Sequence, residues 1–169
     1  IVLTPEYGVI FCTLYGGPKS KLRSMVQTFN SGTLYFYEDK IKKIKKITDF
    51  DVKNFHLSLR TNLYKNCAAN LAMELIYKTK CSGDYKNSFK LLSGFLDGME
   101  LSSEKECKIA LIRFLWRYIT LLGILPELRF CSSCEDVLFR SGKNSYYVDS
   151  LKAFICEDCI SSYKESKMD

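Results

Sequence analysis

The sequence of 169 residues predicts an α+β multidomain protein. Three observations support this fold class. Strand-forming residues and turn signals fill residues 1–50, apolar residues recur at helical spacing over residues 51–126, and two close pairs of cysteines mark residues 127–169. The apolar content of 47% is enough to bury a core. The longest apolar stretch, residues 109–122, is interrupted by two arginines and falls short of the roughly 20 residues that a membrane span needs.

A small β unit is expected over residues 1–50. Residues 8–15 are rich in β-branched and aromatic residues and lead into the turn signal Gly16-Gly17-Pro18, which predicts a strand. Residues 33–37 predict a second strand. The stretch 41–47 (IKKIKKI) places an apolar residue at every third position, and the turn-like residues before it favour a hairpin with residues 35–37 over a short helix.

Three helices are expected between residues 51 and 126. Apolar residues at steps of three and four predict a first helix of about twenty residues from Phe55 to the break at residues 81–83, and a second over residues 84–96. In the third, Ser103 can cap the start together with Glu106, and a glycine and a proline follow residue 122. These apolar stripes are typical of the core of a helix bundle.

The cysteine-rich end has the pattern C-x2-C, then 21 residues, then C-x2-C. Two residues between cysteines let both thiolates of one turn face a single ion, and four thiolates favour zinc, with an iron–sulfur cluster as the alternative. Four cysteine ligands leave no open position on the metal. The ion is therefore expected to stabilise a small module rather than to catalyse. The predicted ligands are Cys131, Cys134, Cys156 and Cys159.

The sequence contains no motif that indicates an enzyme. It has no Gly-rich phosphate loop, no G-x-S-x-G and no H-E-x-x-H. The single histidine, His56, lies far from the cysteines in the chain and is expected to be exposed or to cap a helix.

Positive charge is concentrated in the first third of the chain. Residues 1–60 hold ten Lys and Arg against five Asp and Glu, whereas the remaining residues hold fifteen against fourteen. Cations that neutralise phosphates, next to aromatic rings that stack on bases, suit single-stranded nucleic acid. A solvated lysine-rich surface beside core aromatics is the alternative. The candidate DNA-binding residues are Lys19, Lys21, Arg23, Tyr35, Tyr37, Lys40, Lys42 and Lys43.

Several stretches together resemble the RecO family of bacterial recombination mediators. In chain order they are LTPEYG, GGPKSKLR, VQTFNSGTLYFY, NCAANLAMEL, FLWRYITLLGILPELRFCSSC and FICEDC. The resemblance implies a partial OB-fold β-barrel over residues 1–50, with the family's first strand preceding Ile1. It also implies an α-helical domain over residues 51–126, and a small four-cysteine zinc module with a C-terminal helix over residues 127–169. The sequence departs from the family in its arginine-poor basic turn and at Glu135, where glycine is frequent.

The resemblance also implies a function. RecO proteins are non-enzymatic proteins of recombinational DNA repair after DNA damage, and this chain is accordingly expected in the bacterial cytoplasm, associated with the nucleoid and with no membrane partner. They bind single- and double-stranded DNA, anneal strands, and help to load RecA together with RecR and single-stranded DNA-binding protein. On this reading Lys19, Lys21 and Arg23 belong to the DNA-binding surface, and the four paired cysteines hold one structural Zn²⁺.

Two alternatives stay open. Arg113 and Arg117, one helical turn apart, are candidate contacts for the tail of single-stranded DNA-binding protein, or else ordinary helix cations. The whole chain is alternatively a zinc-ribbon adaptor for protein partners, associated with transcription, in which the lysines only solubilise.

Overall fold

The computed structural model describes residues 1–17, 19–138 and 143–165. The chain forms two compact units, Ile1–Gly123 and Ile124–Asp169, each with its own hydrophobic core. No helix in the described ranges is long and apolar enough to cross a membrane.

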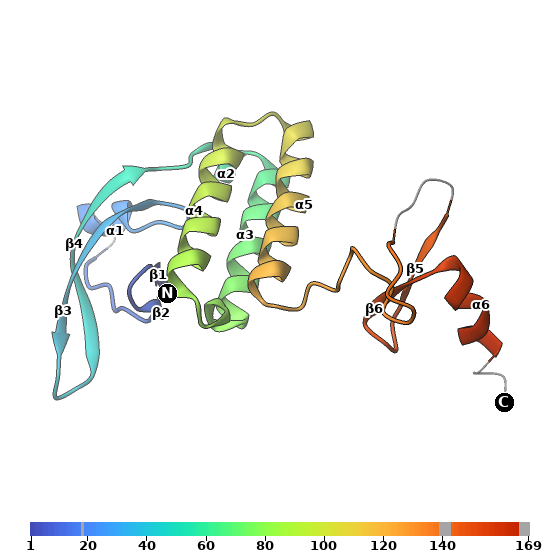
Figure 1. Ribbon diagram of the computed structural model, residues 1–169. Helices are drawn as coiled ribbons and strands as arrows, with labels where there is room; N and C mark the ends of the chain where they lie inside the picture. The colour runs from blue at the N-terminus through green and yellow to red at the C-terminus, as the bar shows by residue number, and fades with distance from the viewer. Residues whose placement is uncertain (18, 139–142, 166–169) are drawn as a thin grey trace. The chain divides into compact units, whose positions relative to one another are not determined.

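The elements of the first unit (Figure 1) are β1 Val2–Thr4, β2 Gly8–Ile10, α1 Lys21–Met25, β3 Ser31–Asp39, β4 Ile44–Asn54, α2 Ser58–Thr61, α3 Leu63–Lys78, the 3₁₀ turn η1 Lys80–Gly83, α4 Tyr85–Leu101 and α5 Glu104–Leu121.

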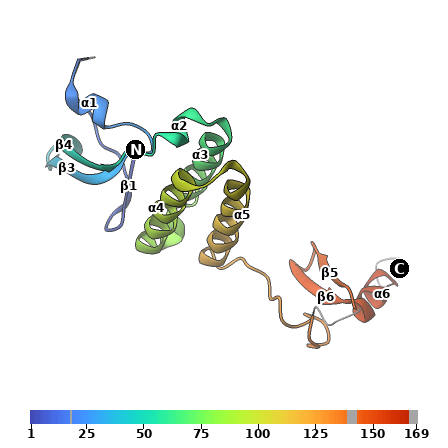
Figure 2. The same ribbon diagram turned by 90° about the horizontal axis from the view of Figure 1, so that it is seen from above.

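The core of the first unit lies among α3, α4 and α5, which run side by side in Figures 1 and 2. Small residues on α3 let the neighbouring helices approach closely, and rings from the other two helices fill the centre. Phe114 is 2% exposed and its ring centroid lies 4.7 Å from that of Phe95 and 5.8 Å from that of Tyr118. The predicted helix-bundle core is confirmed.

The predicted helix boundaries are confirmed in part. Ser103 and Glu106 form the expected capping box at the start of α5. The single helix expected from Phe55 is wrong, because Asn62 has an extended backbone and accepts the backbone N–H of Lys65, so that it ends α2 and caps α3. The second helix, α4, continues to Leu101 and is longer than expected.

The predicted hairpin is confirmed and is longer than the sequence indicated. Strands β3 and β4 pair antiparallel from Ser31↔Asn54 to Asp39↔Ile44. Ile47 and Phe50 are buried and lie opposite Phe36 and Leu34, which identifies the inner face, whereas Tyr35 and Tyr37 project from the outer face. At Gly32 a Cβ atom would lie 2.0 Å from the carbonyl oxygen of Asp51, so only glycine fits this register.

The described strands form three separate two-stranded sheets, β1–β2, β3–β4 and β5–β6, and none of them closes into a barrel. The strand expected over residues 8–15 is shortened to β2. After it, the extended chain makes one isolated parallel bridge from Thr13 to Lys46, with Thr13 N donating to Lys45 O at 2.7 Å. The part of the expected OB barrel that the structure describes is therefore a hairpin with one short added segment.

A buried polar joint holds the end of the β3–β4 hairpin against α4. His56, expected to be exposed or to cap a helix, is 4% exposed instead. Its Nδ1 lies 2.6 Å from the carbonyl oxygen of Phe29 and its Nε2 lies 2.7 Å from Oδ1 of Asp97. Carbonyl and carboxylate oxygens are acceptors, so each contact forms with a ring nitrogen that carries a proton. The joint fixes the hairpin to the helical bundle.

The second unit is a short hairpin followed by a helix. Its elements are β5 Ser145–Val148, β6 Ala153–Cys156 and α6 Glu157–Glu165, and β5 pairs antiparallel with β6. Asn144 N donates to a carboxylate oxygen of Glu157 at 3.2 Å, which ties the start of β5 to the first turn of α6. Among the residues of this unit that the structure describes, the buried ones are Cys131, Leu138, Val148, Ile155 and Cys156.

Candidate nucleic-acid interface and metal centre

The turn between β3 and β4, residues 40–43, is an exposed basic feature of the first unit; it is called the hairpin tip below. Oδ1 of Asp39 accepts the backbone N–H groups of Ile41 and Lys42, each at 3.0 Å, which fixes the turn. All four residues of the tip are exposed, and Ile41 is 94% exposed. Within the described part of the chain, none of its three lysines has a carboxylate within ion-pair distance.

The aromatic face of the hairpin has one basic end and one acidic end. Tyr37 lies opposite Lys46, whose ammonium sits 4.7 Å from the ring centroid of Tyr15. Tyr35 lies opposite Asp49 and bonds to Asp51. The charge of Asp51 and its hydrogen bond with the Tyr35 hydroxyl raise the pKa of Tyr35 above its ordinary value. A phosphate is attracted near Tyr37 and repelled near Tyr35.

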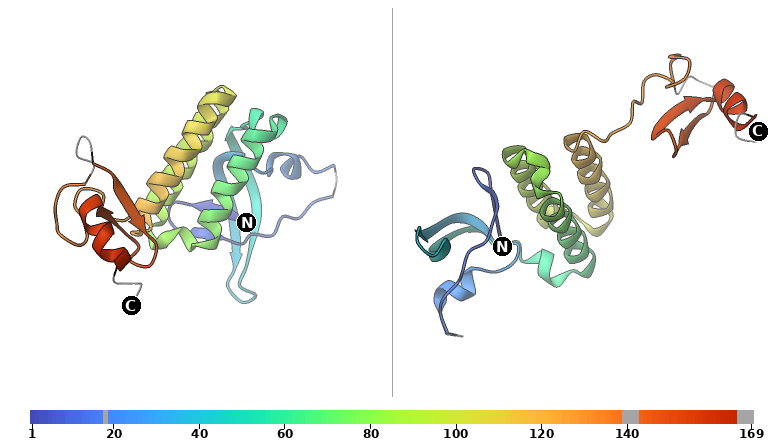
Figure 3. Two further views of the ribbon diagram at one scale, coloured as in Figure 1. Left: turned by 90° about the vertical axis from the view of Figure 1, so that its right-hand side faces the viewer. Right: turned by 90° about the horizontal axis from the view of Figure 1, so that it is seen from below.

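The second basic cluster of the sequence lies on the loop before α1 and on α1 itself. Lys19, Lys21 and Arg23 are all exposed, and Nη1 of Arg23 donates to the carbonyl oxygen of Gly16 at 3.3 Å. Figures 1 and 3 show α1 beside the part of the hairpin remote from its tip. The structure therefore does not bring the two basic clusters together, although they lie close in sequence.

The outer face of α5 carries an apolar stripe flanked by cations. Ile109, Ile112 and Trp116 are 53%, 66% and 48% exposed and follow one another at helical spacing. Arg113 and Arg117 lie on one side of this stripe and both are exposed. No acidic residue occurs between residues 106 and 127. Only the arginines of this face were predicted from the sequence and the apolar stripe was missed, because α5 carries apolar residues on its outer face as well as on its core face.

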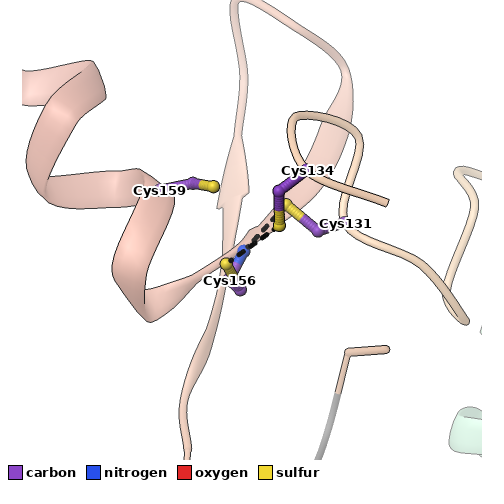
Figure 4. Close-up of side chains that lie close together, drawn as sticks. All are labelled: Cys131, Cys134, Cys156 and Cys159. Carbon is purple, nitrogen blue, oxygen red and sulfur yellow. Dashed lines mark hydrogen bonds between the residues drawn. The ribbon is translucent and has the colours of Figure 1, made fainter. Parts of the chain in front are cut away.

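The four paired cysteines lie together in the second unit (Figure 4), where their sulfur atoms are all within 4.8 Å of one another. Cys131 and Cys134 come from a loop, Cys156 ends β6 and Cys159 lies in the first turn of α6. A tetrahedral zinc ion with bonds of about 2.3 Å requires sulfur–sulfur distances of about 3.8 Å. The Sγ atoms of Cys134 and Cys156 are 3.7 Å apart. The donor set therefore fits a tetrahedral ion such as zinc.

Backbone N–H groups around Cys131 stabilise the thiolate form of its side chain. Its sulfur accepts the N–H of Ser133 at 3.4 Å and that of Cys156 at 3.3 Å. Burial opposes ionisation, but N–H groups of Cys134, Cys156 and Ser133 outweigh it and lower the pKa of Cys131 to about 6. The Ser133 hydroxyl favours ionised Cys159, but the neighbouring thiols of Cys156 and Cys134 raise the pKa of Cys159 to about 12. A bound cation lets all four sulfurs ionise together, because its positive charge offsets the repulsion between neighbouring thiolates.

The turn that carries the first pair is tight. Cys131 N donates to the carbonyl oxygen of Asp136 at 2.7 Å, and Glu135 N donates to that of Cys131 at 2.9 Å. Glu135 has a φ of 60°, in the left-handed region that glycine adopts at the lowest cost. The turn thus forms with glutamate at the position where glycine was expected to be favourable, at some conformational cost.

One family model matches the chain, the one described as recombination protein O C terminal, and it covers residues 60–167. This range includes all of α3, α4 and α5, and the four-cysteine cluster. Neither the comparison with curated proteins nor that with solved structures gave a match. Since the family model covers more than half of the chain, this protein belongs to the RecO family of recombination and repair proteins.

Proposed function

We propose that this chain is a non-enzymatic DNA-binding recombination mediator that binds and anneals single-stranded DNA and also contacts duplex DNA. The observation that carries the proposal is the hairpin tip, where Lys40, Lys42 and Lys43 are exposed at the end of the strand that carries the exposed ring of Tyr37. Exposed ammonium groups neutralise phosphates and an exposed ring stacks on a base. Tyr35 contributes less than Tyr37, because Asp51 occupies its hydroxyl and adds negative charge.

Lys19, Lys21 and Arg23 form a second contact in this proposal. They lie away from the hairpin tip, so a strand that touches both clusters must follow the length of the hairpin. Two separate contacts on one strand raise affinity by increasing the effective concentration of the second site. This geometry favours DNA long enough to reach from one cluster to the other.

The partners in this proposal follow from family membership. The chain acts with RecR and single-stranded DNA-binding protein to load RecA, in the bacterial cytoplasm at the nucleoid. The outer face of α5 supports a contact with an acidic tail that carries apolar residues, because Arg113 and Arg117 flank the exposed ring of Trp116. We assign this face to single-stranded DNA-binding protein.

The cysteine cluster holds one structural Zn²⁺ in this proposal. Four thiolates complete a tetrahedron, so no position remains for a substrate or an activated water. The zinc stabilises the second unit, which has only a small core of its own.

The proposal is tested by fluorescence anisotropy of a labelled single-stranded oligonucleotide over a series of salt concentrations. Each phosphate contact adds about −0.7 to the slope of log K against log[salt], so five contacts give about −3.5. Neutralising the three tip lysines with glutamine should reduce the magnitude of this slope by about 2, and a variant of the second cluster should do the same independently. The control variant neutralises the matched cations Lys105, Lys108 and Arg113 on α5.

The same titration separates the mediator from a zinc-ribbon adaptor. An adaptor shows weak DNA binding without a steep salt dependence, since it makes few phosphate contacts. If the tip variant and the α5 control lose affinity equally, the binding reflects net charge alone and the proposed interface is wrong.

A further inference from the structure

An open pocket of about 420 Å³ lies on the first unit, where the β1–β2 hairpin packs against the helices. Four aromatic rings line it, two from the β1–β2 side and two from the helical side, together with two lysines. These residues are Tyr7, Phe11, Tyr77, Tyr85, Lys78 and Lys80, and we call the site the aromatic pocket. Its volume lies in the range of roughly 300–1,000 Å³ that small ligands occupy.

The rings of the aromatic pocket are exposed although each is large and mostly apolar. Tyr7 and Phe11 are 64% and 65% exposed, and Tyr77 and Tyr85 are 40% and 42% exposed. The rings of Phe11 and Tyr77 meet edge to face, with centroids 6.5 Å apart and planes at 74°. Rings gathered in one exposed patch indicate a binding surface, whereas single exposed apolar residues do not.

The wall formed by η1 is strained and firmly held. Lys80, Cys81 and Ser82 have φ angles of 51°, 60° and 55°, a run of three non-glycine residues in the left-handed region. The buried hydroxyl of Ser88 donates to the carbonyl oxygen of Cys81 at 2.9 Å, and Ser82 Oγ donates to that of Leu121 at 3.1 Å. Such strain persists only where the surroundings enforce it, and it concentrates at functional sites.

The opposite wall is also fixed in place. Gly8, at a φ of 66°, brings the β1–β2 hairpin so close to Tyr85 that a Cβ atom there would lie 2.7 Å from the ring. Both walls are therefore in position before any ligand arrives, which lowers the entropy cost of binding.

The charge of the aromatic pocket indicates an anionic ligand with flat groups. Lys78 and Lys80 are both exposed at its edge, and none of its lining residues is acidic. Flat aromatic faces next to ammonium groups suit a nucleobase and its neighbouring phosphates.

The segment after Phe11 connects this pocket to the proposed DNA interface. Phe11, Thr13 and Tyr15 alternate as exposed residues along extended chain, and Thr13 pairs with β4 while Lys46 covers the ring of Tyr15. At about 3.3 Å per residue, Phe11 and Tyr15 are about 13 Å apart. A short stretch of single strand covers this distance, within the roughly 4–16 nucleotides that a single-strand binding fold occupies.

We propose that the aromatic pocket takes a nucleobase of single-stranded DNA, with the adjacent phosphates against Lys78 and Lys80, and that the strand continues along residues 11–15, which run parallel to β4 and so lead away from the hairpin tip in the direction of α1. The proposal rests on the proposed DNA-binding function and adds a base-stacking contact between the β1–β2 hairpin and the helices. Bases in a duplex are already stacked and paired, so the pocket selects single strands over duplex DNA.

The test measures the affinity of the full chain for a single-stranded oligonucleotide and for a duplex, with the variants Phe11→Ala and Tyr77→Ala. Both rings are exposed enough for removal without loss of the fold, which melting curves check. Each variant should lower single-strand affinity between about fivefold and a hundredfold, the equivalent of one lost stacking contact, and leave duplex affinity unchanged. The salt dependence should also stay unchanged, because the rings carry no charge.

Two controls make the result specific. Tyr77→Phe keeps the ring and should bind as the wild type does. Phe55→Ala removes an aromatic ring of similar exposure, 49%, outside the pocket, and should also bind normally. An oligonucleotide carrying 2-aminopurine gives a direct readout, because stacking quenches its fluorescence and the pocket variants should reduce the quenching.

Single-strand binding by the wild type that Phe11→Ala and Tyr77→Ala leave intact would overturn the pocket proposal while the proposed function stands. Pocket variants that lose binding to an acidic peptide but keep DNA affinity would assign the pocket to a protein partner and likewise overturn it. A wild-type chain that binds neither form of DNA would refute the proposed function, and with it this inference.

Discussion

Replacing Cys131 with serine should unfold the second unit and leave the first one folded. Cys131 is 1% exposed, and its sulfur accepts two backbone N–H groups from the segments that carry the other cysteines. A serine hydroxyl is a poor ligand for zinc, so the variant leaves three thiolates for a metal that requires four ligands.

The size of the effect follows from the small core of this unit. Only five of its described residues are buried, and two of these are the proposed ligands Cys131 and Cys156. A core of this size supplies at most about 3–5 kcal/mol. Structural zinc supplies about 10 kcal/mol or more, which exceeds the whole stability that the apolar residues can provide. The loss of the ion therefore outweighs everything else that holds the unit together.

Metal analysis and hydrogen exchange together test this prediction. The wild-type chain should carry one zinc, and the variant should carry much less. Amides of β5 and β6 should lose protection in the variant, whereas those of α3, α4 and α5 should keep it. Cys67→Ser is the matched control, since Cys67 is exposed on α3 and lies outside the cluster. A Cys131→Ser chain that keeps one zinc and its protected amides would refute a structural four-cysteine site.

Three further predictions concern stability. Gly32→Ala should cost more than about 2 kcal/mol in urea denaturation because its Cβ meets a backbone oxygen, whereas Gly17→Ala, with open space around it, should cost little. Burial favours protonated Glu100, but hydrogen bonds from Ser58 and the charges of His56 and Lys65 outweigh this and lower the pKa of Glu100. At pH values above its ordinary pKa of about 4.3, the Glu100 carboxylate therefore stabilises the fold, and it loses this contribution as the pH falls through its lowered pKa. The difference in free energy of unfolding between the wild type and Glu100→Gln should therefore become smaller as the pH falls through this pKa. A difference that does not change with pH would contradict a stabilising role for the Glu100 carboxylate. Glu135→Gly should raise the melting temperature, since the left-handed backbone conformation costs a glutamate about 1 kcal/mol that glycine avoids. A lower melting temperature would show that the turn is not strained.

Several features were predictable because neighbours along the chain determine them. The capping box joins Ser103 to Glu106, three residues away, and the two C-x2-C pairs lie on tight turns whose geometry depends on a few residues. The helical stripes of α4 and α5 repeat every three or four residues, so the bundle could be read from the sequence. The break at Asn62 was missed, because the apolar spacing continues across it and only its backbone conformation separates α2 from α3.

The sequence by itself determined the family, the helix-bundle core and the four sulfurs as a candidate metal set, because each depends on local spacing and residue type. Only the tertiary structure decided where the charges lie. It separates the basic α1 cluster from the hairpin tip, places Asp51 against Tyr35, and buries His56 between Phe29 and Asp97. It also assembles the aromatic pocket from residues 7–11 and 77–85. The physical reason is that these contacts join segments far apart in the chain, and their positions are set by how the sheets and helices pack rather than by local conformational preference.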